Sequence, residues 1–505
     1  IPYAKPPLGN LRFADPLPVD KWTAIIDGRE MGIQCVQVDS FGMESTDVFG
    51  SEDCLHVNVF APKQLHEDIL NGKKTKKPVI VHIHGGGYVM GSSKMGHPGY
   101  FMDEDVIYAS LNYRLDILGF FTTGDKIARG NQGLKDQTMA LKWIKNNIEH
   151  FGGDPSQITI NGVSAGGSSV HQQMVSPLSK GLFQRVFAQS GAASNTWGLI
   201  SLEQSLEKTK ETAETFNCPT NDNQKLVECL RKIDVETLVT SRIIPLKEEY
   251  ELLHPQKYGV GFVPIVEAVK DEHAFLPEHP LTIISKGKAH KVPLLIGHTT
   301  HEGLMTTSDF DRDPKNFLEF ESKLTPAMKT IFSIENPNAE EIAKQIYNYY
   351  VPNGKELSAD EKQRSYVDML GDAFFSFDIR ETVRLQRKFS PVYYYIHNKT
   401  DIPNFFELFV AISEGTLPPI VTVGWYFIKT FVKENIFRIE TPFRGVNHAA
   451  DGLFYFPMED MGMVVRKEDK FYQYSKDLVK MAVQFTNAHD KMEFRGVAKK
   501  VNKFQ

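Results

Sequence analysis

The sequence predicts an α/β protein with a mostly parallel sheet that is covered by helices on both faces. Short β-branched and aromatic runs alternate along the chain with segments of helical spacing, which is typical of this fold class. The length of 505 residues allows two to four ordinary domains, and it also allows one large α/β domain with insertions. Hydrophobic residues make up 41% and charged residues 24%, close to a soluble globular average, so wholesale disorder is excluded.

The expected strands are residues 78–84, 105–111, 157–162, 183–189, 292–297 and 391–397. Residues 134–151 have helical spacing, and the Gly-Gly-Asp-Pro sequence directly after them stops the helix. Residues 201–247 and 314–387 are mostly helical without a strong strand, so they are interpreted as helical insertions over the sheet. The most linker-like stretch, 63–77, is interpreted as a solvated loop. We therefore expect a single domain over residues 1–505.

Charge and hydropathy exclude several classes of protein. Lys and Arg number 57 and Asp and Glu 63, a formal net charge of −6, and no long basic run occurs, so nucleic acid is not an expected partner. Charged residues and prolines interrupt the longest apolar candidate, 405–432, so a transmembrane helix is not expected. No metal-ligand spacing and no dinucleotide or P-loop glycine pattern occurs in the sequence, so neither a metal nor a cofactor is expected.

The four cysteines form two local pairs by spacing, Cys35 with Cys54 and Cys218 with Cys229. Two disulfides in an oxidising compartment would account for these pairs, and four buried thiols would account for them as well. One N-glycosylation acceptor occurs, Asn398 followed by Lys and Thr, which is near the frequency expected by chance.

A G-x-S-x-G pentapeptide spans Gly162 to Gly166, with Ser164 at its centre. It follows the expected strand 157–162 and opens a helix-compatible segment, 165–174, which is the strand–turn–helix setting of a nucleophile elbow. In such a sharp turn the glycines stand where a Cβ would clash, and the serine hydroxyl lies at the amino end of a helix. The sequence therefore predicts Ser164 as a nucleophile.

A second glycine motif, His84-Gly-Gly-Gly87, follows the first expected strand. Its three glycines leave the backbone N–H groups free of side-chain obstruction. The N–H groups of Gly86 and Gly87, together with that of Ala165, would form a three-point oxyanion hole. A plain glycine-rich turn is the alternative, and the later G-x-S-x-G in the same chain favours the oxyanion hole.

A serine nucleophile needs a base, and the base needs an orienting acid that follows the serine and precedes the histidine in the chain. Glu302 is the leading acid because it closely follows the expected strand 292–297. Asp309 and Asp311 stand further from the strand end and are less favoured. His301 is interpreted as an ordinary neighbour of Glu302.

Two histidines are candidates for the base. His397 ends the expected strand 391–397, and His448 lies further on, in the segment 445–451. A long loop that carries a histidine flanked by small residues suits a side chain that must reach across the sheet. The pattern therefore favours His448 over His397.

Four segments of the chain resemble signatures of the type-B carboxylesterase/cholinesterase family, and most closely those of insect carboxylesterases. These segments are residues 1–13, 51–59, 131–137 and 151–166. The resemblance covers nearly the whole chain and implies an α/β-hydrolase fold with helical insertions. It implies a serine esterase that acts on a small-molecule ester and needs no cofactor.

The resemblance also implies a role for each residue of the site. Ser164 is implied as the nucleophile, Glu302 as the acid and His448 as the base. The implied oxyanion donors are Gly86, Gly87 and Ala165. Trp197 matches a bulky residue that shapes the acyl pocket in related insect esterases, with ordinary core packing as the alternative.

For the cysteines, the resemblance implies the bridges Cys35–Cys54 and Cys218–Cys229, which fall where the family forms its first two disulfides. Disulfides are typical of an oxidising compartment, so we expect a secreted or ER-lumenal protein. We also expect a glycan at Asn398 and a monomer or weak homodimer.

Both ends of the chain match positions inside the family pattern. Ile1 lies within a segment that normally follows an amino-terminal strand region, and Gln505 falls short of the usual last stretch. We therefore expect a chain truncated at both ends, in which a signal region is not present.

Two departures from the family pattern bear on the substrate. The family usually carries Glu directly before the nucleophile, where this chain has Val163, and the segment 36–53 contains no Trp. A cationic substrate needs a carboxylate or an aromatic face in exchange for its hydration, so cholinesterase-like activity is not expected. We expect hydrolysis of neutral, relatively apolar esters, as in xenobiotic detoxification. A juvenile hormone, pheromone or odorant esterase is one alternative, and a non-catalytic cholinesterase-like binding or adhesion protein is another.

Overall fold

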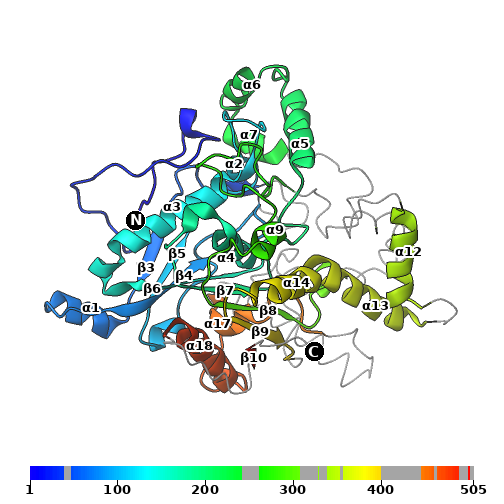
Figure 1. Ribbon diagram of the computed structural model, residues 1–505. Coiled ribbons are helices and arrows are strands. Elements are labelled where there is room, and N and C mark those ends of the chain that lie inside the picture. The colour runs from blue at the N-terminus through cyan, green and yellow to red at the C-terminus, as the bar shows by residue number, and fades with distance from the viewer. Residues whose placement is uncertain are drawn as a thin grey trace.

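An eight-stranded sheet organises the part of the chain that the computed structural model describes (Figure 1). The described residues are 1–38, 47–241, 261–307, 328, 338–352, 357–399, 445–459, 463–487 and 499–500. Along the sheet the strand order is β10-β9-β8-β7-β6-β4-β5-β3. The strands are β3 (Val57–Phe60), β4 (Lys77–Ile83), β5 (Ile107–Leu111), β6 (Gly153–Val163), β7 (Arg185–Gln189), β8 (Leu294–Thr299), β9 (Val392–His397) and β10 (Lys499–Lys500).

The six strands expected from the sequence are the six central strands, and every neighbouring pair among them is parallel. The two outer strands, β3 and β10, pair antiparallel with β5 and β9 and were not expected. A separate two-stranded antiparallel sheet joins β1 (Gln37–Val38) to β2 (Val48–Phe49). The predicted mostly parallel sheet is therefore confirmed.

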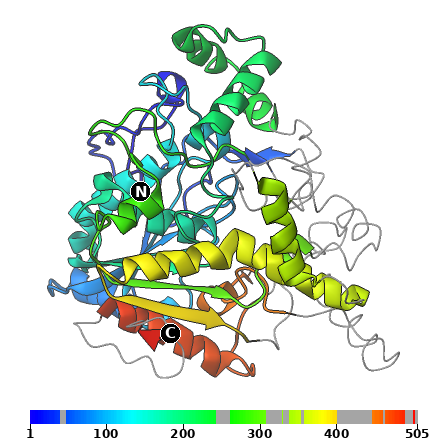
Figure 2. The same cartoon turned by 45° about the vertical axis from the view of Figure 1, so that its right-hand side comes forward.

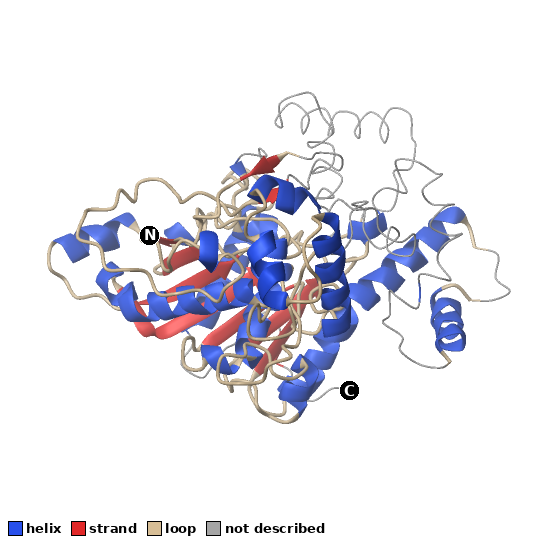
Figure 3. Cartoon of the chain, turned by 90° about the horizontal axis from the view of Figure 1, so that it is seen from above, coloured by secondary structure: helices blue, strands red, loops and turns tan. Residues whose placement is uncertain are grey.

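Helices pack on both sides of this sheet (Figure 3). Those before β8 are α1 (Lys63–Leu70), α2 (Asp116–Phe120), α3 (Gln132–Asn147), α4 (Ala165–Val175), α5 (Leu202–Thr215), α6 (Asn223–Leu230), α7 (Val235–Thr240) and α9 (Pro280–Ser285). Those after β8 are α10 (Leu304–Thr307), α12 (Ala339–Tyr350), α13 (Ala359–Gly371), α14 (Phe377–Gln386), α17 (Gly452–Tyr455) and α18 (Tyr472–Asn487). A π-helical turn, Asp372–Ser376, joins α13 to α14.

The two faces of the sheet carry two separate hydrophobic clusters, because successive strand residues point to opposite sides. Val79, Val81 and Ile83 of β4 belong to the first cluster, which includes apolar residues of α3, α4 and α14. Ile80 of the same strand belongs to the second cluster, in which α17 and α18 supply much of the apolar surface. Figure 2 shows α14 along one side of β8 and β9 and α18 along the other.

The helical insertions are confirmed where the structure describes them. Residues 201–241 form α5, α6 and α7, and residues 338–352 and 357–387 contain α12, α13 and α14. Residues 242–260, 308–327 and the former membrane candidate 405–432 lie outside the described residues. No helix in the described ranges is long and apolar enough to cross a membrane.

The interpretation of residues 63–77 as a solvated loop is wrong for its first half, which forms α1. Leu65 of this helix is buried, and Ile69, one turn later, packs against the first cluster. A spacing of four residues puts both side chains on one face of the helix, so two apolar contacts hold an otherwise exposed helix to the domain.

Two consecutive residues of α3 form buried ion pairs. Asp136 receives two N–H groups from the Arg114 guanidinium, at 2.8 and 2.7 Å, and both side chains are buried. Lys135 lies 3.2 Å from Glu267, which is also buried. Since an unpaired buried charge is costly, these pairs hold two segments against α3: the one after β5, which carries Arg114, and the one between α7 and α9, which carries Glu267.

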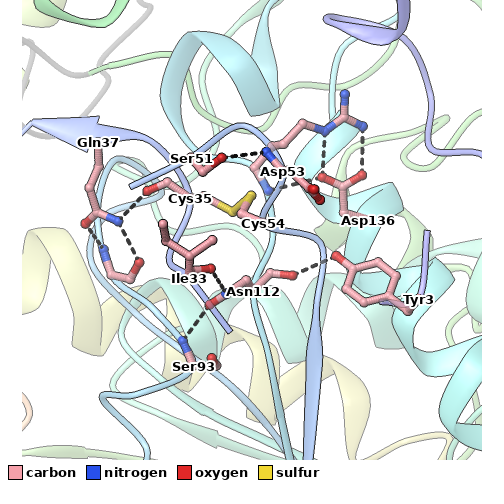
Figure 4. The surroundings of a disulfide bond; sticks show 12 residues. Tyr3, Ile33, Cys35, Gln37, Ser51, Asp53, Cys54, Ser93, Asn112 and Asp136 are labelled. Atoms are coloured by element: carbon pink, nitrogen blue, oxygen red, sulfur yellow. Dashed lines mark hydrogen bonds and ion pairs between the residues drawn. A yellow bond between two sulfur atoms is a disulfide. The ribbon is translucent and has the colours of Figure 1, made fainter. Parts of the chain in front are cut away.

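Both implied disulfides, Cys35–Cys54 and Cys218–Cys229, form in the structure. The surroundings of Cys35–Cys54 are drawn in Figure 4. The first joins the segment before β1 to the segment before β3, and the second joins the loop after α5 to α6. The alternative of four buried thiols is therefore wrong.

Peptide mapping without reduction should recover the two linked pairs and no others. Replacing Cys218 and Cys229 together by Ala should lower the free energy of unfolding by about 2–4 kcal/mol, because the bridge restricts the unfolded chain. Denaturant unfolding measures this change. Free thiols at all four positions, or a link between the pairs, would contradict the assignment.

Candidate active site

Ser164 occupies a tight turn between β6 and α4. Its backbone has φ +60° and ψ −124°, a left-handed conformation that costs a non-glycine residue about 1–3 kcal/mol. Its N–H donates to the carbonyl of Gln189 at 2.8 Å, and its carbonyl accepts the N–H of Ser168 at 2.8 Å. The surrounding hydrogen bonds therefore hold Ser164 in a conformation that the residue alone disfavours.

The glycines around this turn stand where no side chain fits. A Cβ on Gly162 would lie 2.4 Å from the backbone of Gly166, and one on Gly166 would lie 2.1 Å from the carbonyl oxygen of Ile83. A Cβ on Gly191, just after β7, would lie 2.3 Å from the carbonyl oxygen of Ser164. The G-x-S-x-G spacing is thus required by contact between neighbouring backbones.

The glycine loop after β4 lies directly against the serine. A Cβ on Gly85 would come within 2.5 Å of the Val163 carbonyl oxygen and 3.2 Å of the Ser164 Cβ. Gly86 has φ +106°, which glycine adopts without strain, and its carbonyl accepts the N–H groups of Val89 and Met90 at 3.1 Å. This loop turns back on itself next to Ser164.

Glu302 and His448 form a buried pair, although 146 residues separate them in the chain. His448 Nδ1 lies 2.5 Å from Glu302 Oε2, and the two side chains are only 3% and 1% exposed. Glu302 Oε1 accepts the Ser190 hydroxyl and the Thr299 N–H, each at 2.7 Å. The carboxylate is therefore held from β7, from β8 and from the histidine loop.

The electrostatics of Glu302 favour the ionised form. Burial alone would raise its pKa, but the charge of His448 and the hydrogen bonds from His448 and Ser190 outweigh burial, so the pKa lies below its ordinary value. A carboxylate in this state can fix the tautomer of an imidazole and stabilise its protonated form.

The loop that carries His448 is anchored at two further points. The His301 N–H donates to the Val446 carbonyl at 3.0 Å, and the Val446 N–H donates to His301 Nδ1, also at 3.0 Å. Three residues after His448, the buried Asp451 accepts the Gln189 amide at 2.9 Å and the Tyr395 hydroxyl at 3.0 Å. His301, interpreted from sequence as an ordinary neighbour, therefore holds the histidine loop.

An aromatic cluster adjoins His448. The ring of Phe375, in the π-helical turn, lies 4.4 Å from the His448 ring between centroids. Trp197 lies 5.7 Å from Phe375 and 6.4 Å from Tyr88, and its indole N–H donates to the Phe374 carbonyl at 2.8 Å. Half-buried Trp197 is thus linked to the candidate base through one ring.

The other residues singled out from the sequence pack elsewhere, are exposed, or lie outside the described residues. His397 is buried, and its Nδ1 lies 3.1 Å from the Tyr474 hydroxyl. The Val163 side chain packs against the second hydrophobic cluster. Asn398 is exposed directly after β9, but Thr400 of its acceptor motif lies outside the described residues, as do Asp309 and Asp311. The structure thus brings His448, and not His397, against Glu302.

Sequence reasoning missed Ser190 and Phe375. Ser190 follows β7 as Ser164 follows β6, and it too has a left-handed backbone, φ +48°. The position after a central parallel strand was the available signal for Ser190, because such positions gather at one sheet edge. Phe375 lies in a helical insertion, and no pattern in the sequence relates it to His448.

The mostly parallel sheet and the serine turn define an α/β-hydrolase, and comparisons with known proteins agree. The model of the carboxylesterase family matches residues 1–504. The chain is 34% identical over 405 residues to venom carboxylesterase-6 of Apis mellifera, which covers 79% of this chain and 70% of that protein. It is 37% identical over 407 residues to esterase E4 of Myzus persicae, covering 78% and 69%.

Two further relatives match almost the whole chain. The juvenile hormone esterase of Tribolium castaneum is 32% identical over 498 residues, which covers 96% of this chain and 78% of that protein. The crystal structure of juvenile hormone esterase from Manduca sexta, with OTFP covalently attached, has a TM-score of 0.73 at 24% identity. It covers 96% of this chain and 84% of that one, and it shares the fold. The chain belongs to the carboxylesterase family and is a carboxylic ester hydrolase.

Replacing Ser190 by Ala should impair ester hydrolysis without unfolding the protein. A hydrogen bond to a charged group contributes about 1.5–3 kcal/mol, so kcat/KM for 4-nitrophenyl acetate should fall by roughly tenfold or more. Steady-state kinetics measure this loss. Ser205→Ala, which removes a buried hydroxyl from α5, is the matched control and should change kcat/KM by less than about twofold. Equal effects of the two substitutions would contradict a specific role for Ser190.

Proposed function

We propose that the chain hydrolyses neutral, relatively apolar carboxylic esters through an acyl-enzyme on Ser164. The observation that carries this proposal is the buried Glu302–His448 pair, at 2.5 Å, on the same molecule as a serine held in a strained turn against a glycine loop. A nucleophile, a base and an orienting acid are the minimum for this chemistry.

In the proposed mechanism, Ser164 Oγ attacks the ester carbonyl while His448 removes its proton. Glu302 holds the imidazole and stabilises the imidazolium that forms. The backbone N–H groups of Gly86, Gly87 and Ala165 bind the oxyanion of the tetrahedral intermediate. His448 then protonates the leaving alcohol, and water repeats the two steps on the acyl-enzyme to release the acid.

The proposed preference for neutral esters rests on the side chains around the site. Val163 offers no carboxylate next to Ser164, and the segment 36–53 offers no Trp, so both cation partners of the family pattern are missing. The aromatic cluster of Tyr88, Trp197 and Phe375 beside His448 is assigned to the acyl side of the ester, not to the alcohol side where a choline ammonium would lie. We propose that Trp197 and its neighbours bound the acyl group. Xenobiotic detoxification is the proposed role, and the 33% identical relative from Mus musculus named pyrethroid hydrolase Ces2a supports it.

A second candidate is hydrolysis of juvenile hormone or of a pheromone or odorant ester. The observation that favours it is the match to Tribolium castaneum juvenile hormone esterase, which spans 96% of this chain, against 78% for Myzus persicae esterase E4. A panel of esters graded in acyl and alcohol size would separate the two candidates. A binding or adhesion role is not favoured, because the sequence retains Ser164, Glu302 and His448.

We propose a secreted or ER-lumenal location and a glycan at Asn398. Two disulfides are compatible with an oxidising compartment, and the Asn398 side chain is exposed at the end of β9. A monomer or weak homodimer remains the proposed assembly.

Ser164→Ala should abolish turnover of 4-nitrophenyl butyrate while leaving the thermal unfolding midpoint near that of the parent, because the change removes a partly exposed hydroxyl. A fluorophosphonate probe followed by peptide mapping should label Ser164 in the parent and nothing in the variant. Turnover by the variant at roughly a tenth of the parent rate or more would overturn the nucleophile assignment.

Butyrylcholine should be a poor substrate compared with 3,3-dimethylbutyl butyrate, its neutral isostere. A quaternary ammonium loses hydration on binding and finds no carboxylate at Val163, so kcat/KM should be lower by at least roughly tenfold, about 1.4 kcal/mol. Val163→Glu should narrow this ratio. If the parent hydrolyses the two esters equally well, another residue supplies a cation site and the preference for neutral esters is wrong.

A further inference from the structure

The side chain of Gln37 hydrogen-bonds to Gly91, at the end of the loop that begins with the glycines beside Ser164. The Gln37 amide nitrogen donates to the Gly91 carbonyl at 3.0 Å, and its amide oxygen accepts the Gly91 N–H at 2.8 Å. The same nitrogen donates to the Cys35 carbonyl at 2.9 Å. Gln37 is only 4% exposed, so water does not compete for these bonds.

Gly91 packs directly against Gly85, at the start of the glycine loop. A Cβ at Gly91 would lie 2.5 Å from the carbonyl oxygen of Gly85, so the two backbones are in direct contact. A Cβ at Gly86 would lie 2.2 Å from the carbonyl oxygen of Met90, the residue before Gly91. A shift of Gly91 is therefore passed directly to Gly85 and Gly86.

The segment that supplies Gln37 is itself fixed. Cys35 is bonded to Cys54, and Asn112 donates to the Ile33 carbonyl and accepts the Ser93 N–H, at 2.9 and 2.8 Å (Figure 4). Figure 4 shows the Gln37 amide to the left of this disulfide and Asn112 below it. The disulfide and the hydrogen bond to Ile33 therefore restrict the segment 33–37, so that the Gln37 side chain can hold Gly91 in a fixed position.

We infer that Gln37 is a positioning residue for the oxyanion hole, acting through Gly91 on the backbone of Gly85 and Gly86. The inference rests on the proposed function, in which the Gly86 and Gly87 N–H groups bind the oxyanion. Donors for an oxyanion act through their fixed orientation, so a loop free to turn would lose transition-state binding while ground-state binding of the ester persists.

The test compares Gln37→Met and Gln37→Glu with the parent. Methionine keeps the length of the side chain and makes none of the three hydrogen bonds, whereas a glutamate carboxylate keeps only the bond from the Gly91 N–H. For 4-nitrophenyl acetate, kcat should fall by roughly 10- to 100-fold in Gln37→Met, with KM within about threefold. The loss of kcat in Gln37→Glu should be at least as large as in Gln37→Met, because a buried carboxylate would face the Cys35 and Gly91 carbonyl oxygens.

The affinity for a trifluoromethyl ketone gives a second readout. This inhibitor forms an oxyanion adduct with a serine nucleophile, so its inhibition constant should rise in proportion to the loss of kcat/KM. Rates are expressed per active site, counted with a fluorophosphonate probe. Gln132→Met is the matched control, because Gln132 is also buried and its amide nitrogen also bridges two carbonyls, of Phe13 and Phe121 at 3.0 Å. It should lower stability and leave kcat/KM per active site unchanged.

Parent-like kcat/KM per active site in both Gln37 variants, or an unchanged inhibition constant alongside a reduced kcat, would overturn the inference. A loss in Gln132→Met equal to that in Gln37→Met would also overturn it, since general destabilisation would then explain both. Ser164→Ala, measured alongside, reports on the proposed function separately. Turnover retained by Ser164→Ala overturns both proposals, whereas its loss together with parent-like Gln37 variants overturns only the inference about Gln37.

Discussion

Close contact between bare backbones is the constraint on which the candidate site depends. Gly85 and Gly191 let the segments after β4 and β7 approach the Val163 and Ser164 carbonyls, and Gly166 lets the serine turn approach the Ile83 carbonyl at the end of β4, at distances that a Cβ would prevent. The left-handed backbone of Ser164 is kept within these contacts. These segments follow β4, β6 and β7, which are adjacent in the sheet. The register of three parallel strands therefore sets the geometry around one side chain, and a shift of any of them would move the serine.

A second constraint is the burial of the Glu302 carboxylate at the carboxyl ends of β7 and β8, next to the Ser164 turn. A carboxylate as buried as Glu302 persists in the ionised form only with several donors, and Ser190, Thr299 and His448 provide them. Ser190 and Thr299 belong to the ends of β7 and β8, so the same parallel strands that crowd Ser164 also supply partners for the acid. The histidine comes from elsewhere in the chain and is held by its own contacts, those of Val446 and Asp451.

Sequence reasoning found what is local and missed what depends on tertiary contact. The central strands were predictable because both faces of a parallel sheet are buried and their sequences are rich in β-branched and aromatic residues, whereas β3 and β10 are edge strands with weaker patterns. Glu302 was predicted as the candidate acid from its place after a strand, and its contact with His448 joins it to the candidate base. Ser190 and Phe375 were missed because their contacts join positions 112 and 73 residues apart, which no periodicity records. The disulfide pairing was predicted from the family resemblance, because the cysteine spacing alone was also compatible with four free, buried thiols.

The two-sided core also governs the order in which the protein can fold during synthesis. Ile80, Tyr108 and Phe187 lie on the face that Phe454, Leu478 and Phe485 cover. At about 5–20 residues per second, a ribosome needs tens of seconds to extend the chain from the first of these residues to the last. Until then one face of a nascent sheet stays exposed and open to aggregation or to chaperones. His448 lies on the same late segment, so the candidate base arrives together with the surface that closes the core.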